Sequence, residues 1–117
     1  MEEKRKYVRV KAADVRVVYK IMGVKGEYAV PALDISGGGL RLPLKNKVKS
    51  GTLLELNIFL PPGNDPFFGF AKVAWQNPAA KKNEAGIDFY ETGVVFIRVG
   101  FENRKRIINY INTTLSH

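Results

Sequence analysis

Residues 14–22 read DVRVVYKIM, and apolar side chains recur at every second position of this stretch. A period of two is typical of a β-strand that has one face in a core and the other in water. The apolar face would consist of Val15, Val17, Tyr19 and Ile21. The stretch therefore predicts a half-buried strand, and similar stretches recur along most of the chain.

Further stretches have the composition of strands, namely residues 27–35, 40–42, 52–60, 68–76 and 86–99, the last being one long bent strand or two short ones. Pro31 lies inside the first of them and favours an edge position or a bulge, because proline has no N–H to donate. A turn and a polar loop are predicted at residues 61–66 and 77–85. Short strands separated by turns predict a mainly β fold, a closed or nearly closed antiparallel barrel.

The end of the chain changes to a helical period. Mostly apolar residues recur there at intervals of three and four, which would place them in one stripe along a helix. They are Phe101, Arg104, Ile107, Ile108, Ile111 and Leu115. This stripe predicts a helix over about residues 102–115, for which Asn103 is a candidate N-cap. A single helix needs a surface to cover its apolar stripe, so we expect it to pack against an end or an edge of the barrel.

The composition narrows the function classes. A chain of 117 residues is the size of one domain. The absence of cysteine excludes thiol catalysis and cysteine metal sites, and the one histidine is the terminal His117. The carboxylates show no spacing typical of a catalytic pair or a metal site. We therefore expect a protein that is not an enzyme and that holds neither a metal nor a cofactor.

The net charge of +8 is a second constraint. A basic surface attracts phosphates, whether on nucleic acid, on an anionic membrane or on a small ligand. No apolar run approaches the ~20 residues that span a bilayer. The initial residues MEEKRK lead into no apolar stretch, unlike a signal peptide. We therefore expect a cytoplasmic protein without a membrane span, and charge alone leaves its anionic partner open.

A basic cluster lies near the N-terminus, where Arg5 and Arg9 are flanked by Lys4 and Lys11. A guanidinium can donate two parallel hydrogen bonds to guanine O6 and N7, can bridge phosphate oxygens, and can stack on a purine. The cluster therefore suits an anionic guanine ligand. The alternative is a basic arm that is simply solvated.

A second cluster, Asp34-Ile35-Ser36-Gly37-Gly38-Gly39, joins two predicted strands. Glycine permits positive φ and a close approach to a ligand, and free N–H groups in such a turn can bind a phosphate. Asp34 can accept from guanine N1–H and N2–H, and Ser36 can donate to a phosphate oxygen. The alternative is a glycine turn in which both side chains make local bonds. The spacing fits neither a P-loop nor a GxSxG nucleophile elbow.

Together the two clusters resemble the motifs RxxxR and (D/N)xSxxG of the PilZ domain, a bacterial receptor module for cyclic di-GMP. Downstream, residues 71–75 resemble a family strand that ends in an aromatic residue, and residues 90–96 resemble the family strand with the pattern G-V-x-F. The resemblance implies a six-stranded antiparallel split β-barrel with a C-terminal helix over residues 13–117. A basic N-terminal arm, residues 1–12, would precede it.

The resemblance also implies the ligand and its contacts. Arg5 and Arg9 would grip the phosphates and guanine edges of cyclic di-GMP. Asp34 would read the Watson–Crick edge of guanine, and Ser36 and the backbone at Gly39 would meet a phosphate or a guanine. Further candidate contacts are Lys4, Gly38 and Trp75, and the alternative for Trp75 is packing at the rim of the core.

The implied function is capture of cyclic di-GMP, which would order the arm against the barrel and present a changed surface to an effector protein. The sequence does not identify that effector. One alternative is a PilZ-like scaffold that has lost nucleotide binding and acts through protein contacts. Another is a non-specific nucleic-acid binder, although nucleic acid is not the partner that we expect.

Overall fold

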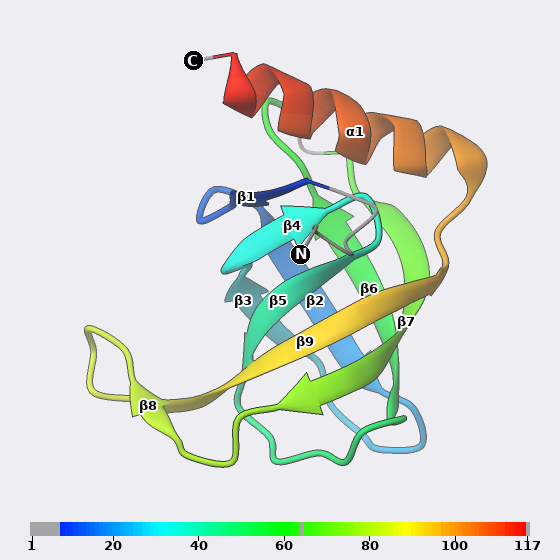
Figure 1. Ribbon diagram of the computed structural model, residues 1–117. Coiled ribbons are helices and arrows are strands. Elements are labelled where there is room, and N and C mark those ends of the chain that lie inside the picture. The colour runs from blue at the N-terminus through cyan, green and yellow to red at the C-terminus, as the bar shows by residue number, and fades with distance from the viewer. Residues whose placement is uncertain (1–7, 64, 117) are drawn as a thin grey trace, which may run out of the picture.

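Figure 1 shows the computed structural model of the chain, which describes residues 8–63 and 65–116. One sheet and one helix make up its regular structure. The strands are β1 (Arg9–Lys11), β2 (Arg16–Ile21), β3 (Tyr28–Pro31), β4 (Asp34–Ser36), β5 (Gly39–Leu44), β6 (Leu53–Phe59), β7 (Phe67–Gln76), β8 (Lys81–Lys82) and β9 (Asp88–Arg98), and the helix is α1 (Phe101–Leu115).

The hydrogen-bonded order of the strands is β1-β4-β5-β9-β7-β6-β2-β3, and β8 pairs with β9 off this path. All neighbours are antiparallel, as the alternating pattern predicts. β1 and β3 form the two ends of the path, so this 9-stranded sheet is not closed. The mainly β fold with a C-terminal helix is confirmed. The prediction of a six-stranded split barrel, closed or nearly closed, is wrong, because the sheet is open and has nine strands.

The sheet stays open at the stretch predicted to be one strand over residues 27–35. β3 pairs only with β2, whereas β4 pairs with β1 and β5. Between them, the Ala32 N–H donates to Val15 O at 2.8 Å and the Leu33 N–H donates to Arg41 O at 2.8 Å. The chain thus changes its pairing partner at these two residues, so the single predicted strand is two. Pro31 lies on the edge strand β3, where its missing N–H is tolerated.

The alternation in β2 marks the core as predicted. Val15, Val17 and Tyr19 are fully buried, and Ile21 is nearly so. The Tyr19 hydroxyl donates to Asn46 Oδ1 at 2.8 Å and accepts from the Lys45 N–H at 3.0 Å. Burial raises the pKa of the Tyr19 phenol, and the N–H of Lys45 acts in the opposite direction. A buried hydroxyl that has both partners fixes the loop between β5 and β6 to the core.

Helix α1 lies across one end of the sheet, above β1 and β4 (Figure 1). Ile107 and Ile111 of the predicted stripe are buried against the sheet, whereas its other apolar members, Phe101, Ile108 and Leu115, are exposed. The N-cap is Gly100 rather than Asn103, so that part of the prediction is wrong. Gly100 has a φ of 88°, which lets the chain turn sharply out of β9 and start the helix at Phe101. The Asn103 side chain instead donates to Val99 O at 2.9 Å.

Two smaller features complete the fold. Residues 77–85, predicted to be a loop, contain the short strand β8. Of the two alternatives for residues 86–99, the structure has one long strand, β9. Within the described part of the chain, no helix is long and apolar enough to cross a bilayer.

Candidate functional site

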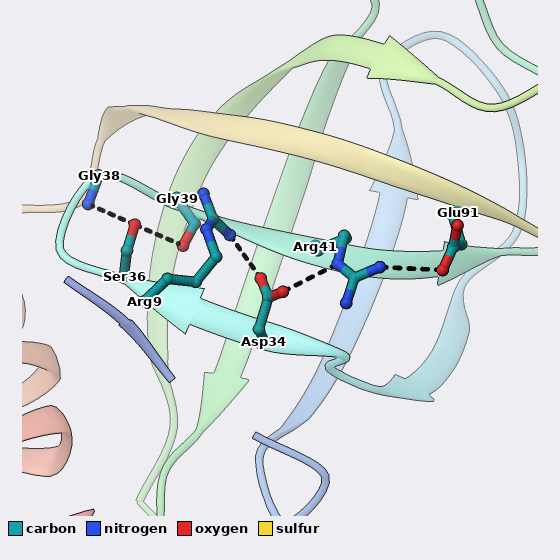
Figure 2. A network of polar contacts seen from close by, with 7 residues as sticks. All are labelled: Arg9, Asp34, Ser36, Gly38, Gly39, Arg41 and Glu91. Carbon is teal, nitrogen blue, oxygen red and sulfur yellow. Dashed lines mark hydrogen bonds and ion pairs between the residues drawn. The ribbon is translucent and has the colours of Figure 1, made fainter. Parts of the chain in front are cut away.

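The two sequence clusters meet because β1 pairs with β4. In this ladder Arg9 lies opposite Ser36, and Lys11 lies opposite Asp34. Directly opposed residues of an antiparallel pair project from the same face, so the Arg9 side chain reaches diagonally to Asp34. Arg9 Nη1 donates to Asp34 Oδ1 at 2.5 Å (Figure 2). Arg9 of the basic cluster is thus bonded to Asp34, the first residue of the glycine-rich cluster.

The Asp34 carboxylate lies between two guanidinium groups (Figure 2). Arg41 Nε donates to Asp34 Oδ2 at 2.8 Å, so each carboxylate oxygen has its own arginine. Arg41 Nη1 continues to Glu91 Oε2 at 2.9 Å, and Lys81 Nζ lies 3.2 Å from Glu91 Oε1. Because Asp34 is only 7% exposed, this network is what makes its buried charge tolerable.

Ser36 makes local bonds with the glycine turn that follows it. Its hydroxyl accepts from the Gly38 N–H at 3.2 Å and donates to Gly39 O at 3.4 Å. Gly39 is needed for space, because a Cβ there would lie 2.1 Å from Val94 O of β9. The glycines with positive φ lie elsewhere, at Gly23, Gly26, Gly51, Gly86 and Gly100. The close backbone approach therefore occurs within the sheet, between β5 and β9.

Hydrogen bonds from helix α1 and from strand β9 also hold the turn at Gly37 and Gly38. Arg104 Nη1 donates to Gly37 O at 2.5 Å, and the Phe96 N–H donates to Gly38 O at 2.9 Å. Both carbonyls of the turn are thus occupied by partners distant in sequence. This bonding fixes the shape of the turn before any ligand arrives, which lowers the entropy that binding would lose.

A row of directly opposed residues extends from this site across the sheet. Asp34 pairs with Arg41, Arg41 with Gly93, and Gly93 with Trp75. Trp75 therefore projects from the same face as Asp34, about 14 Å away over three strand spacings. The indole of Trp75 lies over Gly93, where a Cβ would be 2.2 Å from Nε1, and the residue is 46% exposed. A flat strip of glycine and exposed indole thus adjoins the arginine–carboxylate network.

The structure brings together Arg9, Asp34, Ser36, Gly38 and Gly39, and it places Trp75 on the same face. Lys4 and Arg5 lie outside the described residues. The sequence analysis missed Arg41 and Glu91. The sequence does contain a signal for Arg41. A tight turn that pairs Ser36 with Gly39 also places Asp34 opposite Arg41, two residues further along each strand. Glu91 has no such signal, because it is far away in the sequence.

The chemistry of the site suits an anion that also offers hydrogen-bond donors. A guanidinium has five N–H donors, and Asp34 takes up one nitrogen of Arg9, so further donors face an arriving acceptor. Each Asp34 oxygen keeps a second lone pair. Among residues 8–63 and 65–116, no group of three or more potential metal-ligating histidine, cysteine or acidic side chains comes together.

The family model described as PilZ domain matches residues 3–113 of this chain. The fold is similar to that of the inhibitor of motility MotI/DgrA from Bacillus subtilis, with a TM-score of 0.75 and 20% identity over 98% of this chain and 53% of that chain. The PilZ domain of YcgR from Escherichia coli, solved with c-di-GMP, gives a TM-score of 0.72 and 14% identity over 97% of this chain and 92% of that chain.

A third similar structure is the MrkH–c-di-GMP complex from K. pneumonia, with a TM-score of 0.70 and 14% identity over 97% of this chain and 52% of that chain. The chain thus spans about half the length of MotI/DgrA and of MrkH. No curated protein matches the sequence.

Proposed function

We propose that this chain, which belongs to the PilZ domain family, is a receptor that binds cyclic di-GMP on the surface around Arg9 and Asp34. The observation that carries the proposal is the ion pair between these two residues, because it joins the two motifs in one site. Similar structures solved with c-di-GMP support the same ligand. The role is that of a binding module rather than an enzyme, in a cytoplasmic setting.

The proposed contacts follow from the donors and acceptors at the site. Arg9, together with Arg5 of the arm, donates to phosphate oxygens and to guanine O6 and N7. The hydroxyl of Ser36 and the backbone at Gly38 and Gly39 meet a phosphate or a guanine. Lys4 adds charge, and the exposed indole of Trp75 offers a flat surface on which a base can stack.

Asp34 recognises the guanine in this proposal, through N1–H and N2–H, which adenine lacks. Because Asp34 is nearly buried and Arg9 occupies Oδ1, a guanine edge reaches the carboxylate only when the Arg9 side chain moves aside. The side chain of Arg9 is 31% exposed, which leaves room for that movement. Arg41 stays on Oδ2 and keeps the carboxylate oriented.

Titration calorimetry with cyclic di-GMP tests this function. We expect binding in the micromolar range or tighter for the unaltered chain, and none for Arg9→Ala or Asp34→Ala. Arg9→Lys is expected to fail as well, because lysine keeps the charge and loses the planar fork. Arg16→Lys is the matched control, since the Arg16 guanidinium lies over the ring of Phe59 on β6, away from the site.

Two results would contradict the proposal. A chain that takes up no cyclic di-GMP would favour the alternative of a PilZ-like scaffold that acts through protein contacts only. Binding that persists unchanged in Arg9→Ala and Asp34→Ala would place the nucleotide elsewhere. A single-stranded oligonucleotide that displaces cyclic di-GMP, with an affinity that falls steeply with salt, would favour a nucleic-acid binder instead.

The proposal includes a signal relay through the N-terminal arm to an effector protein that is not identified. A supporting feature is the exposed apolar surface beside the site, formed by Phe68, Val95 and Ile97 on the outer face of β7 and β9. Val95 pairs directly with Gly39, so this surface adjoins the nucleotide site. Exposed apolar side chains that gather on one face are typical of protein contact surfaces.

Amide hydrogen exchange tests the relay. We expect slower exchange in residues 2–8 when cyclic di-GMP is bound, because charge-assisted bonds would hold the arm against the sheet. Exchange that is equally fast with and without the nucleotide, in a chain that binds it, would exclude ordering of the arm as the signal.

A further inference from the structure

Lysine side chains gather at the end of the sheet that lies opposite helix α1. The loop between β2 and β3 and the loop between β5 and β6 both lie at this end (Figure 1). They carry four exposed lysines, which we call the lysine end: Lys25, Lys45, Lys47 and Lys49. The two loops hold one carboxylate, Glu27, and none of the four ammonium groups forms an ion pair with a described residue.

Two aliphatic side chains project beside these lysines. Met22 is 43% exposed and Val24 is 49% exposed, on either side of Gly23. Gly23 has a φ of 82°, which lets the chain reverse within the hairpin while both neighbours point outward. A hairpin tip that exposes Met22 and Val24 to water gains free energy if an apolar medium covers it.

The lysine end is built on anchored loops. Tyr19 of the core holds the backbone of Lys45 through its hydroxyl, and the Gly51 N–H donates to Val73 O at 2.7 Å. The Met22 N–H donates to Leu53 O at 3.0 Å, which ties the hairpin beside the other loop. The two loops that carry the lysines and the aliphatic tip are therefore both bonded to the sheet at this end.

We propose that the lysine end binds the surface of an anionic phospholipid bilayer. The ammonium groups lie among the headgroup phosphates, and the side chains of Met22 and Val24 enter the boundary between headgroups and acyl chains. The aliphatic tip favours a bilayer over nucleic acid, because surfaces that bind single strands use aromatic side chains on which bases stack. The two loops that form this end contain no aromatic residue.

This surface is separate from Arg9 and Asp34, the two residues that carry the proposed nucleotide site. The candidate contact Trp75 lies nearer to it, because the side chain of the adjacent Gln76 bonds to the loop between β5 and β6. Arg9 lies in β1, which is next to the helix at the other end of the molecule (Figure 1). A bilayer bound at the lysine end leaves that region accessible. The inference thus goes beyond cyclic di-GMP binding and does not depend on it.

Co-sedimentation with vesicles tests the proposal. We expect the unaltered chain to bind equimolar phosphatidylglycerol–phosphatidylcholine vesicles, to ignore pure phosphatidylcholine vesicles, and to be released by salt. Lys47→Gln/Lys49→Gln is expected to weaken binding about tenfold or more. The matched control, Arg98→Gln/Lys105→Gln, removes the same charge at the end of β9 and on helix α1, away from the two loops, and is expected to retain binding. Circular dichroism verifies that each variant is folded.

A second variant examines the aliphatic tip. Met22→Ser/Val24→Ser keeps every lysine, and we expect it to weaken vesicle binding while the folded chain persists. The proposal is overturned if the control pair weakens vesicle binding as much as Lys47→Gln/Lys49→Gln does, since net charge alone would then explain the binding. It is also overturned if Met22→Ser/Val24→Ser binds as tightly as the unaltered chain. Lysine-dependent binding of an oligonucleotide without vesicle binding would reassign the surface to nucleic acid.

Discussion

Arg41 holds Asp34 through a hydrogen bond of 2.8 Å from Nε to Oδ2, and its other end is bonded to Glu91. Arg41 belongs to β5, and its guanidinium bonds to one acidic side chain on each neighbouring strand, Asp34 on β4 and Glu91 on β9. A flexible ammonium cannot bridge two carboxylates in this planar geometry. Arg41 is therefore the residue that sets the position of the Asp34 carboxylate in the site.

The first prediction concerns this residue. Arg41→Ala is expected to lower the free energy of unfolding by about 1–3 kcal/mol, because it removes a charged partner from the nearly buried Asp34. Cyclic di-GMP binding should weaken in parallel, with Arg41→Lys intermediate in both. Urea unfolding and calorimetry measure the two effects. Arg98→Ala, an exposed arginine on β9, is the control, and an equal loss in that variant would contradict the assigned role.

Gly39 provides the second prediction. A Cβ at this position would lie 2.1 Å from Val94 O, and a backbone oxygen cannot yield without separating β5 from β9. Gly39→Ala is therefore expected to lower the free energy of unfolding by about 3 kcal/mol or more, the upper end of the usual cost of overpacking. Gly63→Ala is the control, because the nearest atom to its Cβ would be 3.9 Å away. Similar urea midpoints for both variants would refute the prediction.

These residues also show how far the sequence predicts the structure. The alternation in residues 14–22 predicts β2 because a strand with one buried face requires that period. The helix is predictable for the same reason, from its own period. The split between β3 and β4 is not, because strand-like composition continues through residues 27–35 while the hydrogen-bonding partner changes from β2 to β5. The partner of a strand depends on the whole sheet rather than on local composition.

The candidate site divides in the same way. The motif residues Arg9, Asp34 and Ser36 are predictable from their types and spacing, and the structure places them together. Glu91 enters the network only through the register of β5 against β9, which local sequence does not encode. The helix start shows a different limit, because the side chain of Asn103 signals a cap while the backbone freedom of Gly100 decides where the turn occurs.

The third prediction uses the contact between Gly93 and Trp75. A Cβ on Gly93 would lie 2.2 Å from Trp75 Nε1, but this side chain is 46% exposed and can rotate away. Gly93→Ala is therefore expected to be less destabilising than Gly39→Ala and to displace the indole. Trp75 is the only tryptophan, so a shift of the emission spectrum reports the displacement directly. An unchanged spectrum would mean that the indole does not lie over Gly93.

The last prediction concerns pH and the attachment of the helix. The Tyr110 hydroxyl on α1 donates to Asp14 Oδ1 at 2.5 Å, which ties the helix to the start of β2. Burial, followed by the hydrogen bond to Asp14, raises the pKa of Tyr110 from 10.0 to about 12. The unfolded chain therefore loses this proton at lower pH than the folded chain does. The resulting stabilisation is fully present below about pH 10 and is lost as pH rises toward about 12.

Urea unfolding on both sides of pH 10.0, the usual pKa of a tyrosine, measures this loss by comparison with Tyr110→Phe. We expect the unaltered chain to be more stable than the variant near neutral pH, by about 1 kcal/mol for one hydrogen bond. This difference in stability should shrink as pH rises above 10.0, because Tyr110 then loses its proton in the unfolded chain while the folded chain still holds it. Phenylalanine has no such proton, so the stability of the variant lacks this pH dependence. Tyr19 remains in both chains, so its own raised pKa affects both equally. A difference that stays constant over this range would show that the Tyr110 phenol is not held by Asp14.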